Sequence, residues 1–170
     1  MKKIYIILII SIFASSAGCG KYINKKNIVL SPSNKISIEF LLNNNGTPNY
    51  IVLHKNNIAI DTSKMGFDFK ELESMQNGFK INDIINISYN NNWEMPWGEQ
   101  RIVDNHYNEM IIKLEEDKAP NRKLNIYFRA YDDGIGFRYE FPEQKNIDSL
   151  IILDENTQFN LTGNHTCWWI

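Results

Sequence analysis

The chain has 170 residues, enough for one domain of ordinary size or for part of a larger one. Its hydrophobic content of 43% and its net charge of −2 at pH 7 are typical of a globular protein. A nucleic-acid-binding protein usually carries a basic stripe, and this sequence has none, so we expect no nucleic acid among its partners.

Residues 1–18 have the pattern of a secretory signal peptide. A charged start at Lys2 and Lys3 is followed by an apolar run over residues 4–13 and by small residues up to Gly18. Such a segment is too short and too weakly flanked to be a spanning helix. The run Ser16-Ala17-Gly18-Cys19 resembles the bacterial lipoprotein signal, although Leu is the usual residue where Ser16 stands.

That resemblance implies that Cys19 is acylated and becomes the mature N-terminus. Several acyl chains on one cysteine would anchor the protein firmly to a membrane. We therefore expect an exported lipoprotein, periplasmic or attached to the outer membrane, with a tether over residues 19–26 and a folded domain over 27–170; the alternative is simple secretion. Cys167 is the only other cysteine. It is left without a disulfide partner and is predicted to be a small buried hydrophobe.

Strand-like segments with turn signals between them fill the rest of the chain. The clearest is 36–42, where Ile36, Ile38, Phe40 and Leu42 alternate with other residues at the period of a half-buried strand. Further strands are predicted at 49–54, 58–60, 66–70, 79–89, 109–114, 124–131, 135–141 and 150–153. No window has a capped stripe with a period of 3.6 residues, so few helices are expected. Many short strands at this spacing indicate an all-β fold, a sandwich or a barrel.

The stretch "YFRAYDDGIGFRYEF", residues 127–141, is predicted to be a hairpin. Asp133-Gly134 has the composition of a two-residue type I′ turn. Closure there would pair Phe128 with Tyr139 on an apolar face and place Arg129 opposite Arg138 on the other. Opposed arginines need carboxylates nearby, so we expect a charge-paired outer sheet face, with Glu140, Asp132 and Asp133 as the partners, rather than an active site.

The stretch "NNWEMPWGEQRIVDNHYNE", residues 91–109, is the candidate for binding chemistry. Its strand character is poor, and it brings Trp93, Trp97 and Glu99 close together in sequence. Exposed tryptophan beside a carboxylate is suited to carbohydrate, because the ring stacks on the sugar face and the acid bonds hydroxyls. The alternative is that Trp93 or Trp97 closes the core of the sandwich.

Catalytic and metal-binding motifs are not found. His54, His106 and His165 are isolated, and neither a His-Glu-x-x-His, a Gly-x-Ser-x-Gly nor a phosphate loop occurs. We therefore predict no catalytic residue, no metal ligand and no cofactor in this chain.

Five motifs occur together in the order seen in glycoside hydrolase family 97, the α-glucosidases and α-galactosidases of Bacteroides-like bacteria. They are "SPSNKISIEF", "NGTPNYIV", "WEMPWGEQRIVDNHYNE", "FRAYDDGIGFRYEFPEQ" and "ENTQFNLTGNHTCWWI". The resemblance covers residues 29–170. It implies an antiparallel β-sandwich related to galactose mutarotase (a supersandwich), followed in the family by a catalytic (β/α)₈ barrel that holds calcium and the catalytic acids.

The resemblance implies that this chain is the N-terminal domain alone, with a sandwich incomplete at its C-terminus. The calcium glutamate that the N-terminal domain contributes in the family lies beyond the segment matching Trp168-Trp169-Ile170, so no metal or catalytic residue is assigned here. The expected function is a non-catalytic, carbohydrate-associated domain that packs on the barrel. The alternatives are a stand-alone lipoprotein module that binds α-linked oligosaccharide, and a gene remnant without function.

Overall fold

The computed structural model describes residues 26–145 and 147–167, and all regular structure among them is β-strand. The strands are β1 (Ile28–Leu30), β2 (Ile36–Leu42), β3 (Pro48–His54), β4 (Asn57–Lys64), β5 (Phe67–Phe69), β6 (Phe79–Glu94), β7 (Ile102–Glu116), β8 (Lys123–Ala130), β9 (Ile135–Glu140), β10 (Ile152–Glu155) and β11 (Asn160–Leu161). Within this part of the chain no helix is long and apolar enough to cross a membrane. The predicted signal peptide, Cys19 and nearly all of the tether lie outside the described residues.

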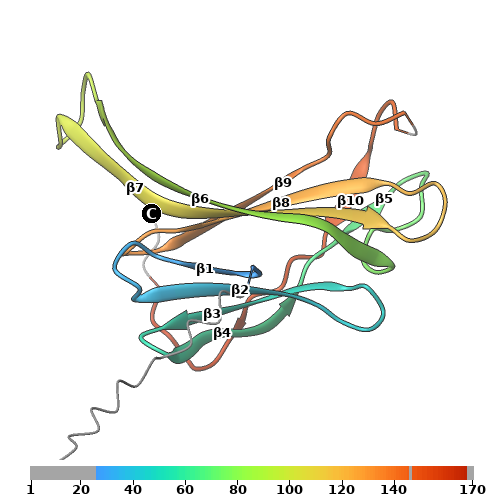
Figure 1. The fold of residues 1–170 in the computed structure, drawn as a ribbon, viewed down its shortest axis with the longest axis horizontal. Coiled ribbons are helices and arrows are strands. Elements are labelled where there is room, and N and C mark those ends of the chain that lie inside the picture. Colours follow the sequence, from blue (N-terminus) through green and yellow to red (C-terminus); the bar gives the residue numbers. More distant parts are fainter. Residues whose placement is uncertain (1–25, 146, 168–170) are drawn as a thin grey trace, which may run out of the picture.

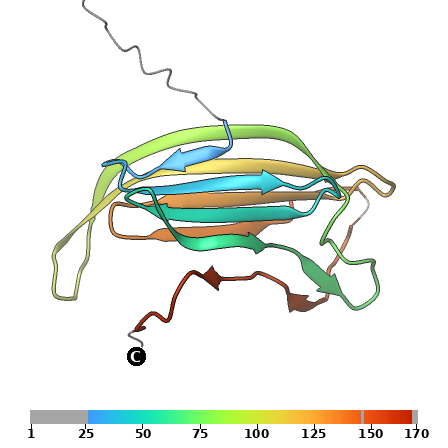
Figure 2. The ribbon, with the colours of Figure 1, turned by 90° about the horizontal axis from the view of Figure 1, so that it is seen from below.

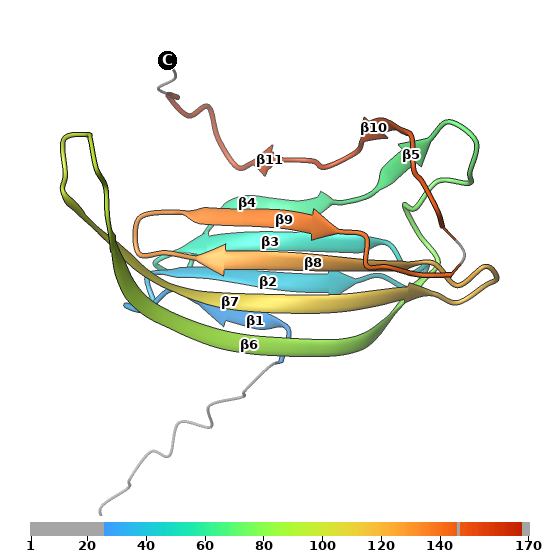
Figure 3. The ribbon, with the colours of Figure 1, turned by 90° about the horizontal axis from the view of Figure 1, so that it is seen from above.

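Two antiparallel sheets face each other and form a sandwich (Figure 1). One sheet has the order β1-β2-β3-β4-β11 and the other β6-β7-β8-β9. Figure 2 shows the first sheet in front, and Figure 3 shows the second sheet in front of it. A short pair, β5 with β10, lies at one end, and the segment that carries β10 and β11 runs along one edge of the sandwich (Figure 3). The all-β sandwich predicted from the sequence is confirmed.

The core lies between the two sheets and follows from alternation along the strands. Ile38 and Phe40 of β2 point inward, as do Ile126 and Phe128 of β8, and all four are buried. The ring of Phe128 lies 6.4 Å from that of Phe40 and 5.8 Å from that of Tyr50, so it joins the two sheets. Burying one such side chain contributes about 1.5–3 kcal/mol to stability.

The hairpin of β8 and β9 has the predicted faces but not the predicted register. Phe128 pairs with Phe137 and Tyr127 with Arg138, so the strands are shifted by two residues and Arg129 lies opposite Gly136. The connection is therefore a four-residue loop, 131–134, closed by a bond from Tyr131 N to Gly134 O of 2.9 Å. The prediction of a two-residue turn at Asp133-Gly134 is therefore wrong. A shift by two keeps every side chain on its face, because the side-chain period of a strand is two.

The hairpin of β6 and β7 is longer than the sequence indicates. Its pairing runs without a break from Asp83–Lys113 to Glu94–Ile102, so residues 91–94 and 102–109 are strand. The poor strand propensity of this stretch is outweighed by the continuous ladder with its partner strand. The end of the hairpin projects past the other strands and bends away from the five-stranded sheet (Figure 1).

The turn between β3 and β4 and the position of Cys167 also differ from the prediction. The tight turn between β3 and β4 is formed by Lys55 and Asn56, both with positive φ, one residue earlier than expected. Cys167 is exposed rather than buried, since it follows the last strand on the outer edge of the sandwich.

Candidate functional site

The tip of the β6–β7 hairpin carries the residues singled out by the sequence. The two strands are joined by residues 95–101, and Met95 N donates to Arg101 O at 2.8 Å. Arg101 Nε also lies 2.7 Å from Glu94 Oε1, with both side chains largely exposed. The tip is therefore held by its own backbone and by one surface ion pair, and it receives little support from the core.

Trp93, Trp97 and Glu99 all lie on this tip, and none belongs to the core. Trp97 is 83% exposed and Trp93 is 49% exposed. The alternative that these tryptophans close the sandwich is therefore wrong for both. Trp93 pairs with Val103 on the outer face of the sheet, whereas Trp97 and the exposed Glu99 stand in the connecting turn. Among the described residues no ring contact joins Trp93 to Trp97, so they do not form one continuous stack.

An aromatic row continues from the tip along the outer face of the β6–β9 sheet. Tyr89 of β6 pairs with Tyr107 of β7, and their rings stack at 4.8 Å. Tyr131 lies on the other side of Tyr107, with ring centroids 5.0 Å apart. Tyr107 points away from the core but is only 4% exposed, because its neighbours cover it. Burial is the main cause that raises the pKa of its phenol.

Glu109 and Arg129 form an ion pair on this same outer face. Arg129 Nε donates to Glu109 Oε2 at 2.6 Å, and Glu109 is 3% exposed. The guanidinium of Arg129 also lies over the ring of Tyr107, with Cζ 4.5 Å from the ring centroid. The hydrogen bond to Glu109 raises the pKa of Arg129. The charged group of Arg129 is thus fixed on two sides.

A second arginine, Arg138, lies beside this pair on β9. Its Cζ is 3.5 Å from the ring centroid of Tyr127. The hydroxyl of Tyr127 donates to Glu140, which also accepts from Asn125 Nδ2 at 3.0 Å. These two bonds lower the pKa of Glu140, and the bond to Glu140 raises the pKa of Tyr127. The outer face is therefore charge-paired, but Arg129 is paired with Glu109 of β7 instead of with Glu140, Asp132 or Asp133.

Sequence reasoning missed Tyr89 and Tyr107 as members of this face. Strand alternation was the available signal, since Tyr89 and Trp93 are four residues apart and must share a face. The poor strand propensity of residues 91–109 hides this alternation in the sequence. The hairpin ladder is what brings Tyr107 beside Tyr89.

Metal binding has no support among the described residues. No group of three or more His, Cys, Asp or Glu side chains in that part of the chain is arranged to hold a metal ion.

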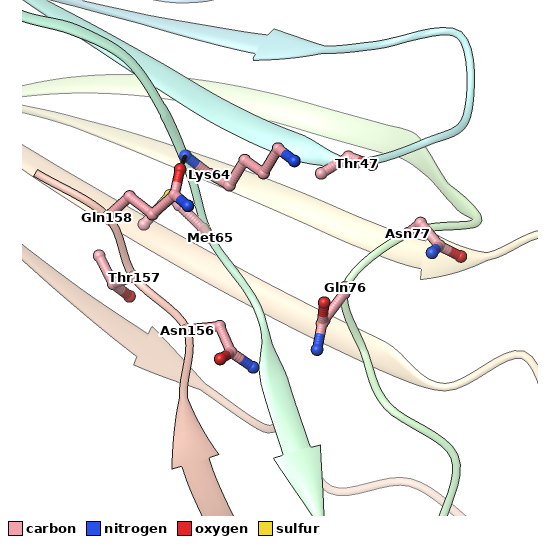
Figure 4. A pocket seen from close by; sticks show the side chains of 8 residues that line it. All are labelled: Thr47, Lys64, Met65, Gln76, Asn77, Asn156, Thr157 and Gln158. Carbon is pink, nitrogen blue, oxygen red and sulfur yellow. Dashed lines mark hydrogen bonds between the residues drawn. The ribbon is translucent and has the colours of Figure 1, made fainter. Parts of the chain in front are cut away.

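A separate polar hollow of about 440 Å³ lies near the edge of the sandwich (Figure 4). It is lined by Thr47, Lys64, Met65, Gln76, Asn77, Asn156, Thr157 and Gln158. Asp68 accepts from Gln76 Nε2 at 2.7 Å and from Asn156 Nδ2 at 2.9 Å. Gln158 N donates to Lys64 O at 2.9 Å. These bonds tie the C-terminal segment to β4 and β5, so we interpret this hollow as structural.

The chain matches known proteins in both sequence and fold. Residues 29–170 match the family model described as "Glycosyl-hydrolase 97 N-terminal". The chain is similar to a glycoside hydrolase family 97 enzyme from Pseudoalteromonas sp. strain K8, solved with panose and with acarbose, with 34% identity and a TM-score of 0.78. The match covers 84% of this chain and 22% of that chain.

A further match is the crystal structure of a beta-arabinopyranosidase, with 22% identity and a TM-score of 0.71. It covers 79% of this chain and 21% of that chain, and at this identity it supports the fold alone. This chain thus spans about a fifth of the length of the solved proteins that it matches. Because the family model covers nearly all of the described residues, the chain belongs to glycoside hydrolase family 97, as its N-terminal domain.

Proposed function

We propose that this domain is the non-catalytic, carbohydrate-associated N-terminal part of an α-glycosidase that acts on α-glucosides or α-galactosides. It packs on a catalytic (β/α)₈ barrel, and its hairpin tip contacts the α-linked oligosaccharide through Trp93, Trp97 and Glu99. The observation that carries this proposal is the 83% exposure of Trp97 at the end of a projecting hairpin. The panose and acarbose complexes of the Pseudoalteromonas relative support the substrate class.

An exposed tryptophan is suited to this role for a physical reason. Its ring offers a large apolar surface in water, and covering that surface with the apolar face of a sugar is favourable. Glu94 is already paired with Arg101. Glu99 makes no hydrogen bond or ion pair with any other described residue, so its carboxylate remains available to sugar hydroxyls.

The proposal also includes export and anchoring. Acylation of Cys19 would hold the domain at a membrane on the outer side, in the periplasm or on the outer membrane, and calcium would be bound by the barrel. Cells fed a labelled fatty acid are expected to label the protein, and Cys19→Ser is expected to abolish the label. Equal labelling of this variant would contradict the anchor.

Isothermal titration of the purified domain with panose tests the carbohydrate role. We expect saturable binding, weakened by Trp97→Ala and by Trp93→Ala. Leu153→Ala is the matched control, because Leu153 is 64% exposed but lies on β10, away from the hairpin. Titrations that stay flat up to about 10 mM panose would contradict the proposal. A dissociation constant of that size corresponds to a binding free energy of only roughly 3 kcal/mol.

A further inference from the structure

A small hollow lies on the outer face of the sheet, between β8 and β9. It has a volume of about 210 Å³ and is lined by Tyr127, Arg129, Tyr131, Gly136, Phe137 and Arg138. Gly136 is the partner of Arg129 in the β8–β9 ladder. A Cβ at position 136 would meet nothing within 4 Å. The hollow therefore exists because the residue facing Arg129 has no side chain.

The polar walls of this hollow are held in place before any ligand arrives. Arg129 is fixed between Glu109 and the ring of Tyr107. Arg138 stacks on Tyr127, and the hydroxyl of Tyr127 is tied to Glu140. Groups that are already ordered lose little conformational entropy on binding, so such a site binds more tightly than a flexible one.

The charges around the hollow are balanced. Arg129 is paired with Glu109 at 2.6 Å. Arg138 lies close enough to Glu140 to contribute to the lowered pKa of that carboxyl group. Two guanidinium groups thus face two carboxylates, and the site has no excess positive charge to attract an anion. Its planar rings and guanidinium groups instead present apolar faces together with hydrogen-bond donors.

The volume indicates the size of the ligand. Pockets for drug-sized ligands measure roughly 300–1,000 Å³, so 210 Å³ suits a single ring. A pyranose has an apolar face that stacks on tyrosine and a rim of hydroxyls that accept from arginine. We propose that this hollow binds one neutral pyranose residue of an oligosaccharide, an inference that rests on the proposed carbohydrate-associated function.

Aromatic residues lie on the outer face between the hollow and the hairpin tip. Tyr131 lines the hollow and contacts Tyr107, which stacks on Tyr89 of β6. Trp93 follows on the same face of β6. Tyr107 itself is covered by its neighbours, so the accessible aromatic groups between the hollow and the tip are the half-buried Tyr89 and the exposed Trp93.

Titration with panose, followed by calorimetry and by backbone amide NMR, tests the inference. Gly136→Val fills the hollow and Arg138→Ala removes one wall, and each is expected to weaken binding at least about tenfold. In the unaltered protein the amide of Gly136 is expected to shift on titration. Gly134→Ala is the matched control, since a Cβ there also meets nothing within 4 Å and Gly134 lies outside the hollow. Thermal unfolding confirms that each variant is folded.

The outcomes separate this inference from the proposed function. If Trp97→Ala abolishes binding while Gly136→Val and Arg138→Ala bind like the unaltered protein, the hollow is not the site and the proposed function stands. If the unaltered protein binds no neutral oligosaccharide, the pyranose site and the proposed carbohydrate-associated function are both overturned. Tighter binding of glucuronic acid than of glucose would overturn the assignment of a neutral ligand.

Discussion

Glu116 and Arg122 form a buried bidentate ion pair at the turn between β7 and β8. Arg122 Nε lies 2.7 Å from Glu116 Oε2, and Arg122 Nη2 lies 2.5 Å from Glu116 Oε1. The other donors of Arg122 reach the carbonyls of Glu73 at 2.7 Å and Ser74 at 3.2 Å. One guanidinium group thus joins this turn to the loop that precedes β6.

Arg122→Ala is expected to destabilise the domain by about 3–5 kcal/mol, because it leaves the carboxylate of Glu116 buried and without its partner. Urea unfolding measures the difference. Arg101→Ala is the control, since the side chain of Arg101 is 81% exposed in its pair with Glu94 and such pairs contribute about 0–1 kcal/mol. Equal losses of unfolding free energy in the two variants would contradict the expected difference between the buried and the exposed ion pair.

Gly46→Ala is expected to lower stability by about 1–3 kcal/mol or more. Gly46 has φ +70°, and a Cβ there would lie 2.4 Å from the backbone nitrogen of Phe79. The same approach carries the hydrogen bond from Phe79 N to Gly46 O at 3.0 Å, so the backbone cannot move aside without losing it. Gly134→Ala, with open space around its Cβ and no positive φ, should change stability little. Similar melting temperatures for both variants would show that the close approach of Phe79 does not exclude a side chain at position 46.

Stability is expected to fall as the pH rises above about 10, the ordinary pKa of tyrosine. Burial raises the pKa of Tyr139 in the folded state. The neutral phenol is therefore favoured by folding, and this contribution is complete below the unfolded pKa and lost as the pH rises from there through the folded pKa. Burial raises the pKa of Tyr50 in the same direction.

Tyr139→Phe tests that assignment. Between pH 8 and pH 11 the variant should lose less stability than the unaltered domain. Some loss with rising pH should remain, because Tyr50 also has a raised pKa. At pH 8 it should be weaker by about 0.5–1.5 kcal/mol, because the hydroxyl contact of Tyr139 with Thr157 Oγ1 at 2.5 Å is removed. An unchanged slope would contradict the role of Tyr139.

The isolated domain is expected to release no nitrophenol from α-glucosides or α-galactosides, with or without calcium. Glycoside cleavage needs two carboxyl groups held about 5–10 Å apart across the bond, one of them free to donate a proton. Glu109 is buried against Arg129, and Glu99 stands on the projecting hairpin turn. Turnover that disappears in Glu99→Gln or Glu109→Gln would contradict this expectation.

The sequence by itself determined most of the strands and the faces of the clearest ones. Alternation at period two placed Ile38 and Phe40 of β2, and Phe128 and Phe137 of the β8–β9 hairpin, toward one core, and the structure confirms this. The ordered motifs over residues 29–170 also indicated the family that the comparisons show. Side-chain alternation belongs to a single strand, and the order of the motifs belongs to the linear sequence. Burial of one face therefore fixes the direction of each side chain wherever the strand lies in the sheet.

Only the tertiary structure decided the register of the β8–β9 hairpin and the shape of the outer face. A shift of two residues leaves each side chain on its face, so alternation does not distinguish the two pairings. The four-residue loop is held from outside, by a bond of 2.8 Å from Ser33 N to Asp132 Oδ1. The contacts of Glu109 with Arg129 and of Tyr107 with Tyr89 likewise join separate strands. Such contacts depend on which strands become neighbours, and packing of the whole sheet decides that.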